Sequence, residues 1–434
     1  MNTHPEREIN IEVPVMVRLE GEGALSFQAS NGKVEQLHLR IYEPPRLFEE
    51  FLVGRNYTDV PTITARICGI CPIAYQMTSI LALEKLFDVE PGPWVYDMRR
   101  LLYCGEWLQS HALHIHLLAA PDFLGFDNAI DMAEDHPETV TRGMRLQALG
   151  NEILRLLGGR SVHPIGLKVG GFHKAPSVDA AQSLLKKCEA ALDDVRQLVA
   201  WCAQLNLPED QQQFTSVAIH NENEYAIMPG RLRSDAGLNI GFNQYADNFA
   251  EEQVPHSTAF YSRLNGHSYF LGPLARVNLN FSQLPGSVKA WAEAQGLKFP
   301  SADMFHNVVA RAIECHYALE ESIRILKAYQ LPESPFVEVV PKAGVGEFCT
   351  EAPRGMIYHR YQVDASGSIR AATIIPPTSQ NQLRIEENLK SSVERFGLNH
   401  TDDELRLFCE KIIRNYDPCI SCSVHFLKLD VDRC

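Results

Sequence analysis

Apolar and polar residues alternate near both ends of the chain, the pattern of a half-buried β-strand. The alternating segments form two pairs: 9–18 with 34–42, and 356–364 with 368–375. Asn31-Gly32 lies between the first two segments and Ala365-Ser366-Gly367 between the second two. Such short polar and glycine-containing links favour tight turns. The sequence therefore predicts a hairpin near each end, the first forming a small N-terminal β-layer.

Most of the remaining chain has helical periodicity, with apolar residues three and four positions apart. The predicted helices cover 73–87, 94–118, 139–157, 176–205, 302–330, 380–396 and 402–414. Their apolar faces are expected to pack into a bundle. Residues 215–285 are richer in glycine, asparagine and aromatic residues and lack this period. They predict an insertion of loops and short strands.

We find no internal repeat and no Pro/Ser-rich linker, so the pattern predicts a single α+β domain, residues 1–434, with mainly a helical-bundle core and small peripheral β-hairpins. Its expected parts are an N-terminal β-layer (1–45), a helical core (46–214 and 286–350), the insertion (215–285), and a C-terminal part with a hairpin and helices (351–425).

Composition excludes several functions. The chain has 434 residues, 45% hydrophobic and 22% charged, which is enough to bury a large core. Its net charge of −14, with no run rich in lysine or arginine, argues against a nucleic-acid partner. No apolar stretch is long enough to span a bilayer, and the first residues lack a signal-peptide core. Eleven cysteines fit a reducing compartment, so a cytoplasmic location is expected.

Two Cys-x-x-Cys pairs, Cys68-Gly69-Ile70-Cys71 and Cys419-Ile420-Ser421-Cys422, carry the chemistry. Four thiolates form a ligand set that selects soft or borderline metals. Structural zinc modules usually separate such pairs by only about 15–20 residues, whereas most of this chain lies between them. A thioredoxin-like motif would need a βαβ context, and the second pair lies too near the end for a following helix. A buried catalytic metal centre and a zinc site remain the two interpretations from spacing alone.

The flanks of both pairs are specific. Arg66-Ile67-Cys68-Gly69-Ile70-Cys71-Pro72 and Asp417-Pro418-Cys419-Ile420-Ser421-Cys422-Ser423-Val424-His425 resemble the two nickel-binding signatures of the [NiFe]-hydrogenase large subunit. Further matching segments occur in order along the chain: Arg18-Leu19-Glu20-Gly21, Arg46-Leu47-Phe48-Glu49, Gly158-Gly159-Arg160 with His163-Pro164, Glu351-Ala352-Pro353-Arg354-Gly355, and Pro376-Pro377-Thr378-Ser379-Gln380-Asn381. The resemblance spans essentially the whole chain and is nearest to the multi-subunit branch that couples hydrogen to soluble cofactors.

The resemblance implies a nickel–iron centre whose iron carries carbon monoxide and cyanide. Cys68 and Cys419 match the terminal nickel ligands, and Cys71 and Cys422 match the cysteines that bridge nickel to iron. Cyanide ligands need hydrogen-bond donors in a water-poor cavity. The matching positions around them are Arg354, Pro377 and Thr378.

The resemblance also assigns the path of the proton released when hydrogen splits heterolytically. The Cys419 thiolate matches the base, and Glu20 matches the carboxylate that passes the proton outward. Glu22 does not fit the Arg-x-Glu-Gly register and is predicted to be a solvated residue. Arg354 matches the guanidinium above the open coordination site, where a fixed positive charge polarises hydrogen.

A second metal ion, magnesium or iron, is implied near the C-terminus. Glu49, the carbonyl of Ile374 and His425 match its ligands, and oxygen and imidazole donors suit such a cation. The interval to Cys68 favours Glu49 over the adjacent Glu50.

Several positions depart from the family pattern. Tyr75 stands where many members have a histidine, although tyrosine can still donate a hydrogen bond. Ser110 replaces a carboxylate above the active site. The nearby His111, His114 and His116 are interpreted first as core or surface histidines.

Many relatives lose a C-terminal peptide to an endoprotease once nickel is inserted. Residues Phe426–Cys434 follow the residue that matches the cleavage point, His425, and form a candidate maturation peptide. A maturation chaperone and an endoprotease are therefore expected partners.

The electrons require an iron–sulfur partner, because the other cysteines are scattered singly and no Gly-x-Gly-x-x-Gly motif offers a dinucleotide site. The resemblance supplies a small subunit with iron–sulfur clusters, joined by flavin-containing diaphorase subunits that react with NAD(P). The alternatives are a hydrogen-sensing regulatory subunit and a non-catalytic scaffold stabilised by zinc. A quinone-linked respiratory subunit of the same fold is disfavoured because such proteins lack the four cysteines.

Overall fold

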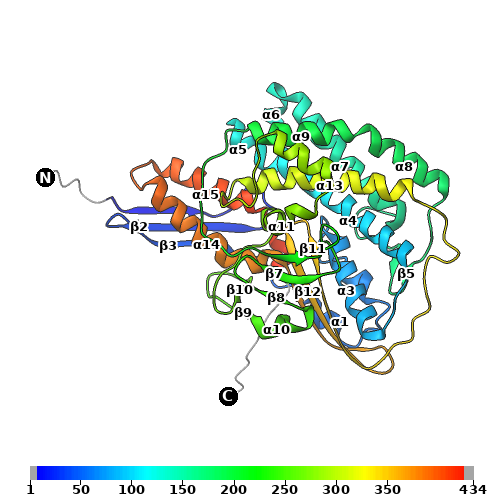
Figure 1. The fold of residues 1–434 in the computed structure, drawn as a ribbon. Helices are drawn as coiled ribbons and strands as arrows, with labels where there is room; N and C mark the ends of the chain where they lie inside the picture. Colours follow the sequence, from blue (N-terminus) through cyan, green and yellow to red (C-terminus); the bar gives the residue numbers. More distant parts are fainter. Residues whose placement is uncertain (1–6, 425–434) are drawn as a thin grey trace, which may run out of the picture.

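The computed structural model describes residues 7–424, and long helices make up much of one side of it, at the upper right in Figure 1. The bundle consists of α3 (Pro72–Phe87), α4 (Pro93–Leu113), α7 (Pro137–Gly158), α8 (Val178–Ala190), α9 (Leu192–Gln204) and α13 (His306–Lys327). α4 packs between α7 and α13, and α13 also contacts α8 and α9. Proline at the first position of α3, α4 and α7 suits a helix start, where its missing N–H is not needed.

Two predicted helices differ in detail from the structure. The stretch 176–205 is not one helix, because the backbone leaves the helical conformation at Ala191 (φ −90°, ψ 0°) and separates α8 from α9. The stretch 94–118 continues beyond α4 as a π-helical turn, η1 (His114–Ala119). Apolar periodicity is nearly unchanged across both irregularities, so the pattern does not reveal them.

The N-terminal β-layer is a three-stranded antiparallel sheet in the order β1–β2–β3: β1 (Ile9–Val13), β2 (Gly23–Ser30) and β3 (Lys33–Ile41). The prediction that 9–18 pairs with 34–42 is wrong. The Asn31-Gly32 turn joins β2 to β3, and β1 pairs with the other edge of β2. Residues of β2 are almost all buried, so the strand lacks the alternation of apolar and polar residues that predicts a half-buried strand.

Residues 215–285 contain short strands and turns, and near their end also the helix α11 (Pro273–Asn280), which the sequence pattern does not predict. The elements of this insertion before α11 are β6 (Val217–His220), β7 (Arg231–Ser234), β8 (Asn239–Ile240), η2 (Phe242–Gln244), α10 (Tyr245–Asn248), β9 (Phe249–Glu252) and β10 (Tyr261–Leu264). They form a sheet β6–β7–β8 and a hairpin β9–β10. Their apolar residues gather with parts of β11 and β12 in a second, smaller core cluster.

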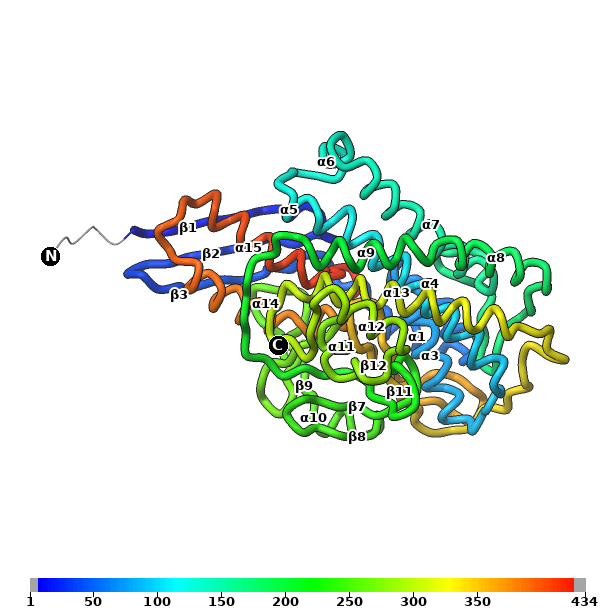
Figure 2. Tube along the Cα trace, turned by 45° about the horizontal axis from the view of Figure 1, so that its top comes forward, coloured from blue at the N-terminus to red at the C-terminus, as the bar shows by residue number. Residues whose placement is uncertain are grey.

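The C-terminal part is a three-stranded sheet followed by helices: β11 (Gly344–Ala352), β12 (Gly355–Val363), β13 (Ile369–Ile375), α14 (Pro377–Phe396), α15 (Asp402–Tyr416) and α16 (Ile420–Ser423). The predicted hairpin is β12–β13. β11 adds a strand within a stretch that was expected to be helical. Figures 1 and 2 show α14 and α15 lying along the N-terminal sheet, where α14 contacts β3 and α15 contacts β1.

Short elements complete the described chain: α1 (Phe48–Leu52), α2 (Val60–Thr64), α5 (Ala120–Leu124), α6 (Ala129–Asp135), β4 (Leu167–Lys168), β5 (Gly171–Phe172), α11 (Pro273–Asn280), η3 (Phe281–Gln283) and α12 (Gly286–Ala294). No helix within residues 7–424 has the length and apolar character needed to cross a membrane. The main hydrophobic core runs through the N-terminal sheet, the bundle and the C-terminal helices, and it includes all four cysteines of the two pairs. The fold class is α+β, as predicted.

Candidate metal centre

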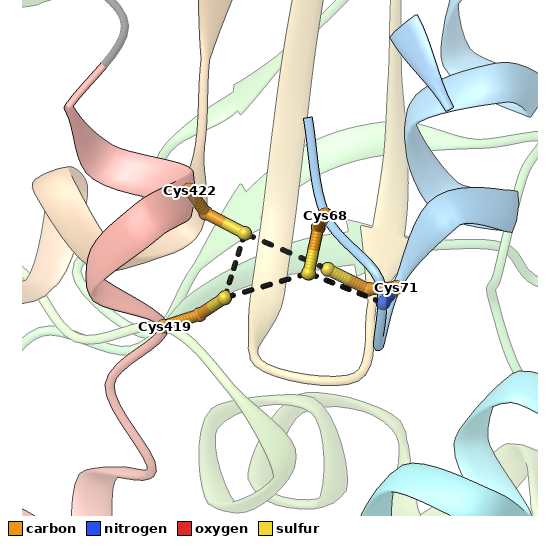
Figure 3. Close-up of side chains that lie close together, drawn as sticks. All are labelled: Cys68, Cys71, Cys419 and Cys422. Carbon is orange, nitrogen blue, oxygen red and sulfur yellow. Dashed lines mark hydrogen bonds between the residues drawn. The ribbon is translucent and has the colours of Figure 1, made fainter. Parts of the chain in front are cut away.

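The two Cys-x-x-Cys pairs meet in the core and face each other (Figure 3). Cys68 lies in the loop before α3, and Cys71 directly precedes the first residue of that helix. Cys419 and Cys422 lie at the start and on the single turn of α16. The Sγ atoms of Cys68 and Cys419 are 3.6 Å apart, and those of Cys71 and Cys422 are 3.8 Å apart. The fold thus closes a gap of more than three hundred residues to bring four sulfurs together.

The spacing of the sulfurs fits ligands of a soft metal. Two thiolates at about 2.3 Å from one ion in tetrahedral geometry are about 3.8 Å apart. The two distances between the pairs match this value, while Cys419 and Cys422 approach to 2.7 Å. Each of the four residues is at least 97% buried, and all four are free thiols. This donor set fits a nickel-containing centre.

The pKa values of these thiols are shifted in opposite directions. Hydrogen bonds from the thiol of Cys419 and its neighbours lower the pKa of Cys68, whereas burial raises the pKa of Cys419 and Cys422. Four thiolates at this distance would repel one another in a site without water. A bound cation is therefore needed for all four to be ionised together.

Glu20 lies against the second pair. Its Oε2 accepts hydrogen bonds from the Cys419 thiol at 3.0 Å and from the Ser421 N–H at 3.1 Å. Its carbonyl accepts from the Ile420 N–H at 2.9 Å, which fixes the segment beside α16. Burial and the nearby Cys68 raise the pKa of Glu20. Glu22, in contrast, is exposed.

Arg354 occupies the turn between β11 and β12 and is 3% exposed. Its Nη2 donates to Asp417 Oδ1 at 2.9 Å and its Nε donates to the Asp417 carbonyl at 2.7 Å. Nη1 is buried and has no hydrogen-bond partner within residues 7–424. Gly355 makes this turn possible, because its φ of +132° disfavours any side chain and a Cβ would lie 2.7 Å from Leu271.

Thr378 and Pro377 lie at the first turn of α14. The Thr378 hydroxyl oxygen accepts from the Cys419 N–H at 2.9 Å. This bond uses an N–H at the start of α16, so α14 positions the second pair. Both residues are buried.

The predicted magnesium ligands are only partly described. Glu49 Oε1 accepts from the Ile374 N–H at 2.6 Å, so this carboxylate reaches the strand whose carbonyl was predicted as a ligand. Burial raises the pKa of Glu49 to about 8, whereas Glu50 is exposed. His425 and the candidate peptide Phe426–Cys434 lie outside the described residues.

The departures from the family pattern are buried near the same core. Tyr75 lies on α3 with its ring 5.9 Å from that of His359, and Ser110 is fully buried on α4. The three histidines of this region are core residues: His111 pairs with Glu314, His114 with the Arg414 carbonyl, and His116 with the Ala112 carbonyl. Burial lowers the pKa of His111 to about 4, so its imidazole is neutral.

Sequence reasoning assigned no role to several residues that build the site. Arg46 Nη2 donates to the carbonyl of Ile67, next to Cys68, and to that of Ser421, next to Cys422. Glu106 accepts from the N–H groups of Ile73 and Ala74 at the start of α3. Arg311 contacts Asp417 Oδ2 at 3.3 Å and thereby supports the partner of Arg354. Arg46 and Asp417 lie within matching segments, and Glu106 lies four residues before Ser110, whereas nothing near Arg311 in sequence points to the site.

A family model described as nickel-dependent hydrogenase matches residues 46–145 and 232–425. Among curated proteins, the chain is 33% identical to sulfhydrogenase 2 subunit alpha of Pyrococcus furiosus, over 96% of this chain and 100% of the relative. It is 27% identical to the NAD-reducing hydrogenase HoxS subunit beta of Cupriavidus necator, over 95% of this chain and 94% of the relative.

Solved structures agree with this relationship. A crystal structure of an NAD⁺-reducing [NiFe]-hydrogenase in the H2-reduced state aligns with a TM-score of 0.86 and 26% identity, covering 96% of this chain and 99% of that chain. The Ni-Fe-Se hydrogenase of D. vulgaris Hildenborough aligns with a TM-score of 0.81 over 96% of this chain and 100% of that chain. Its identity of 24% shows the shared fold alone.

Proposed function

The chain belongs to the nickel-dependent hydrogenase family, as a [NiFe]-hydrogenase large subunit and an oxidoreductase acting on H2, and from this premise we propose how its residues serve that reaction. In our proposal Cys68, Cys71, Cys419 and Cys422 hold a nickel–iron centre whose iron carries one carbon monoxide and two cyanides. When bound, this group supplies the site at which H2 is split heterolytically. The closure of four buried sulfurs around one point carries the proposal.

In this proposal the second pair accepts the proton and passes it on. Cys419 Sγ accepts the proton released from H2, and Glu20 Oε2, 3.0 Å away, receives it next. A carboxylate suits this role when its pKa lies near the working pH, and the burial that raises the pKa of Glu20 moves it in that direction. Cys68, at 3.6 Å from Cys419, lacks a comparable carboxylate among its hydrogen-bond partners in the described chain.

Arg354 supplies a fixed positive charge beside the sulfurs. Its guanidinium cannot be deprotonated, and Asp417 holds its orientation through two hydrogen bonds. The free Nη1 donor is available to a cyanide or to hydrogen as it polarises. Thr378 and Pro377 border the same ligands in our proposal, and Thr378 also fixes the Cys419 backbone.

Glu49, the Ile374 carbonyl and His425 complete the proposal with a magnesium or iron ion. The hydrogen bond from the Ile374 N–H brings Glu49 to this strand. Binding a cation would favour the ionised carboxylate, which burial alone disfavours.

Electrons leave through other subunits. Besides the four sulfurs, the only group of ligand residues that converges within the described chain is formed by two histidines and a glutamate, which cannot hold an iron–sulfur cluster. Large-subunit relatives imply a small-subunit partner, which we propose carries iron–sulfur clusters. The NAD-reducing relative supports further diaphorase subunits with flavin and NAD(P), and hence a cytoplasmic location. A maturation chaperone and an endoprotease that removes Phe426–Cys434 belong to the same proposal.

Infrared spectroscopy of the protein purified with its native partners tests this proposal, because metal-bound carbon monoxide and cyanide absorb where protein does not. We expect their bands, and we expect them to shift under hydrogen. Stoichiometric zinc without these bands would overturn the proposal in favour of a zinc-stabilised scaffold. Bands combined with negligible turnover in a steady-state H2 assay would instead identify a hydrogen-sensing subunit.

A further inference from the structure

A second cluster of metal-ligand side chains lies outside the cysteine site. His38 on β3, His256 in the loop between β9 and β10, and Glu386 on α14 converge from segments that are far apart in sequence. Glu386 Oε2 lies 3.1 Å from His38 Nδ1, and Glu386 Oε1 lies 3.1 Å from His256 Nε2. The two imidazole rings stack with centroids 3.9 Å apart.

The carboxylate of Glu386 is buried without a strong cationic partner. Its side chain is 8% exposed, and it also accepts from the Leu39 N–H and the Tyr261 hydroxyl. None of its hydrogen-bond or ion-pair partners within residues 7–424 is a lysine or an arginine. Burial opposes ionisation, but hydrogen bonds from His256, His38 and Tyr261 outweigh it and lower the pKa of Glu386. The carboxylate is thus held by four hydrogen bonds, and a cation bound beside it would also neutralise its charge.

The geometry suits one ion. Two ligands at about 2.1 Å from a metal in tetrahedral geometry are about 3.4 Å apart. The two nitrogen–oxygen distances are slightly shorter, at 3.1 Å each; they end on different oxygens of Glu386 and are also those of ordinary hydrogen bonds. All three ligand atoms lie within 4.8 Å of one another. One ion would replace both imidazole–carboxylate hydrogen bonds, and the two stacked rings would turn so that both nitrogens face it.

The cluster is accessible from outside. A surface cavity of about 590 Å³ is lined by His256 with its sequence neighbours, such as Thr258, and by a second segment that includes Ile41, so it reaches the cluster at His256. His38 and His256 are each partly exposed, at 27% and 18% of their side chains. An ion can thus approach the cluster from the side of His256, and water can complete its coordination.

We propose that His38, His256 and Glu386 form a binding site for a divalent transition metal of the zinc class. Two imidazoles and a carboxylate are the ligand set that such ions prefer, in contrast to the thiolates of the hydrogen-activating centre. The site is independent of the proposed function, because it lies on other side chains and holds no sulfur.

The metal would tie three parts of the molecule together: the N-terminal sheet, the insertion and α14. Glu386 lies eight residues after Thr378 on α14, about 12 Å along the helix. Thr378 accepts from the Cys419 N–H, so the ion would steady the helix that positions the second cysteine pair. Its role is to support the structure rather than to take part in hydrogen chemistry.

Cobalt titration tests the site. The purified hydrogenase with its partner subunits is dialysed against EDTA and titrated with Co²⁺, whose absorption reports sulfur ligands through an intense charge-transfer band. We expect one equivalent to bind without that band. Elemental analysis after Zn²⁺ addition should give the same stoichiometry.

Variants locate the ion. His256→Ala and Glu386→Gln should each weaken this cobalt equivalent by about 100-fold or more, because each removes a direct ligand. His267→Ala, an exposed histidine of the same insertion, is the matched control and should bind as the wild type does. Glu386→Gln keeps the size of the side chain, so it remains informative if His256→Ala folds poorly.

Two results would overturn the inference: wild-type enzyme that takes up no sulfur-free cobalt, or variants that retain it. The first would identify the cluster as a hydrogen-bonded imidazole–carboxylate group. Hydrogenase activity and the infrared bands are recorded on the same samples, so failure of this site is distinguishable from failure of the nickel–iron centre.

Discussion

The two cysteine pairs share one spacing but are held in different ways. In the first pair, the Cys68 sulfur accepts from the N–H groups of Ile70 and Cys71, its own near neighbours. The second pair is held by distant residues: Thr378 contacts the backbone of Cys419, and Glu20 contacts its sulfur. The Cys68 sulfur therefore takes its backbone hydrogen bonds from its own turn, with Arg46 and Glu106 supporting that segment from a distance, whereas Cys419 depends on tertiary contacts.

This difference separates contacts that maintain the fold from contacts that are proposed to take part in the reaction. The residues that hold the second pair, Glu20, Arg354 and Thr378, are also those proposed to act on the proton, the polarised hydrogen and the cyanides. A change among them should affect turnover more than folding. Arg46 contacts the segments of both pairs, so substituting it tests whether the two pairs depend on each other for metal binding.

The largest effect is expected from Cys419→Ser. Serine is nearly isosteric but offers a hard oxygen in place of the soft thiolate and base. Turnover of H2 should be abolished while circular dichroism remains that of the wild type. Cys409→Ser, at a buried cysteine of α15 away from the site, is the control and should keep most activity. Retained turnover in Cys419→Ser would refute its proposed role.

Glu20→Gln should slow turnover by about 10²-fold or more, the usual contribution of a positioned acid–base group. The amide can still contact Cys419 and the Ser421 N–H, so nickel content should be nearly unchanged. Proton–deuterium exchange and metal analysis on the same sample measure both quantities. The exposed Glu22→Gln is the matched control. Parallel loss of nickel and turnover would make Glu20 a structural residue.

Arg46→Lys sharpens the comparison between the pairs. Lysine keeps the charge but cannot present the same planar donor to the Ile67 and Ser421 carbonyls. Loss of one such charged hydrogen bond, about 1.5 kcal/mol, should weaken nickel retention by about tenfold. Nickel content after dialysis against a chelator measures this. The control variant Arg40→Lys, on the N-terminal sheet, should leave the nickel content unchanged.

The smallest effect is expected from Thr378→Val, which removes the acceptor of the Cys419 N–H. The cost is about 1 kcal/mol, or about fivefold in turnover, since one buried donor loses its partner. A shift of the cyanide bands in the infrared spectrum should accompany it. Thr141→Val, exposed on α7, should show neither change. An unchanged spectrum in Thr378→Val would separate this residue from the metal ligands.

Prediction from sequence succeeded where the pattern was local. The periodicity of α3, α7 and α13 identified the bundle, and the alternation of β12 and β13 identified their hairpin. It failed where burial removed the pattern. β2 is buried on both faces and lacks the alternating pattern, so the sequence pairs β1 with β3 instead of β2.

The residues of the cysteine site show the same division. Both pairs, Glu20 and Arg354 could be named from motifs, because their neighbours in sequence are distinctive. Arg311 and the cluster of His38, His256 and Glu386 could not, because each is isolated in sequence and gains its partners only through packing.

The sequence by itself determined the ligand types, their i, i+3 spacing and the family of the chain. Only the tertiary structure decided which groups meet them: the carboxylate 3.0 Å from Cys419, the Asp417 that orients Arg354, and the Arg46 shared by both pairs. The physical reason is that the type of a single residue fixes which donor atom a ligand offers. Its distance, burial and pKa depend instead on segments that the core brings together from across the chain.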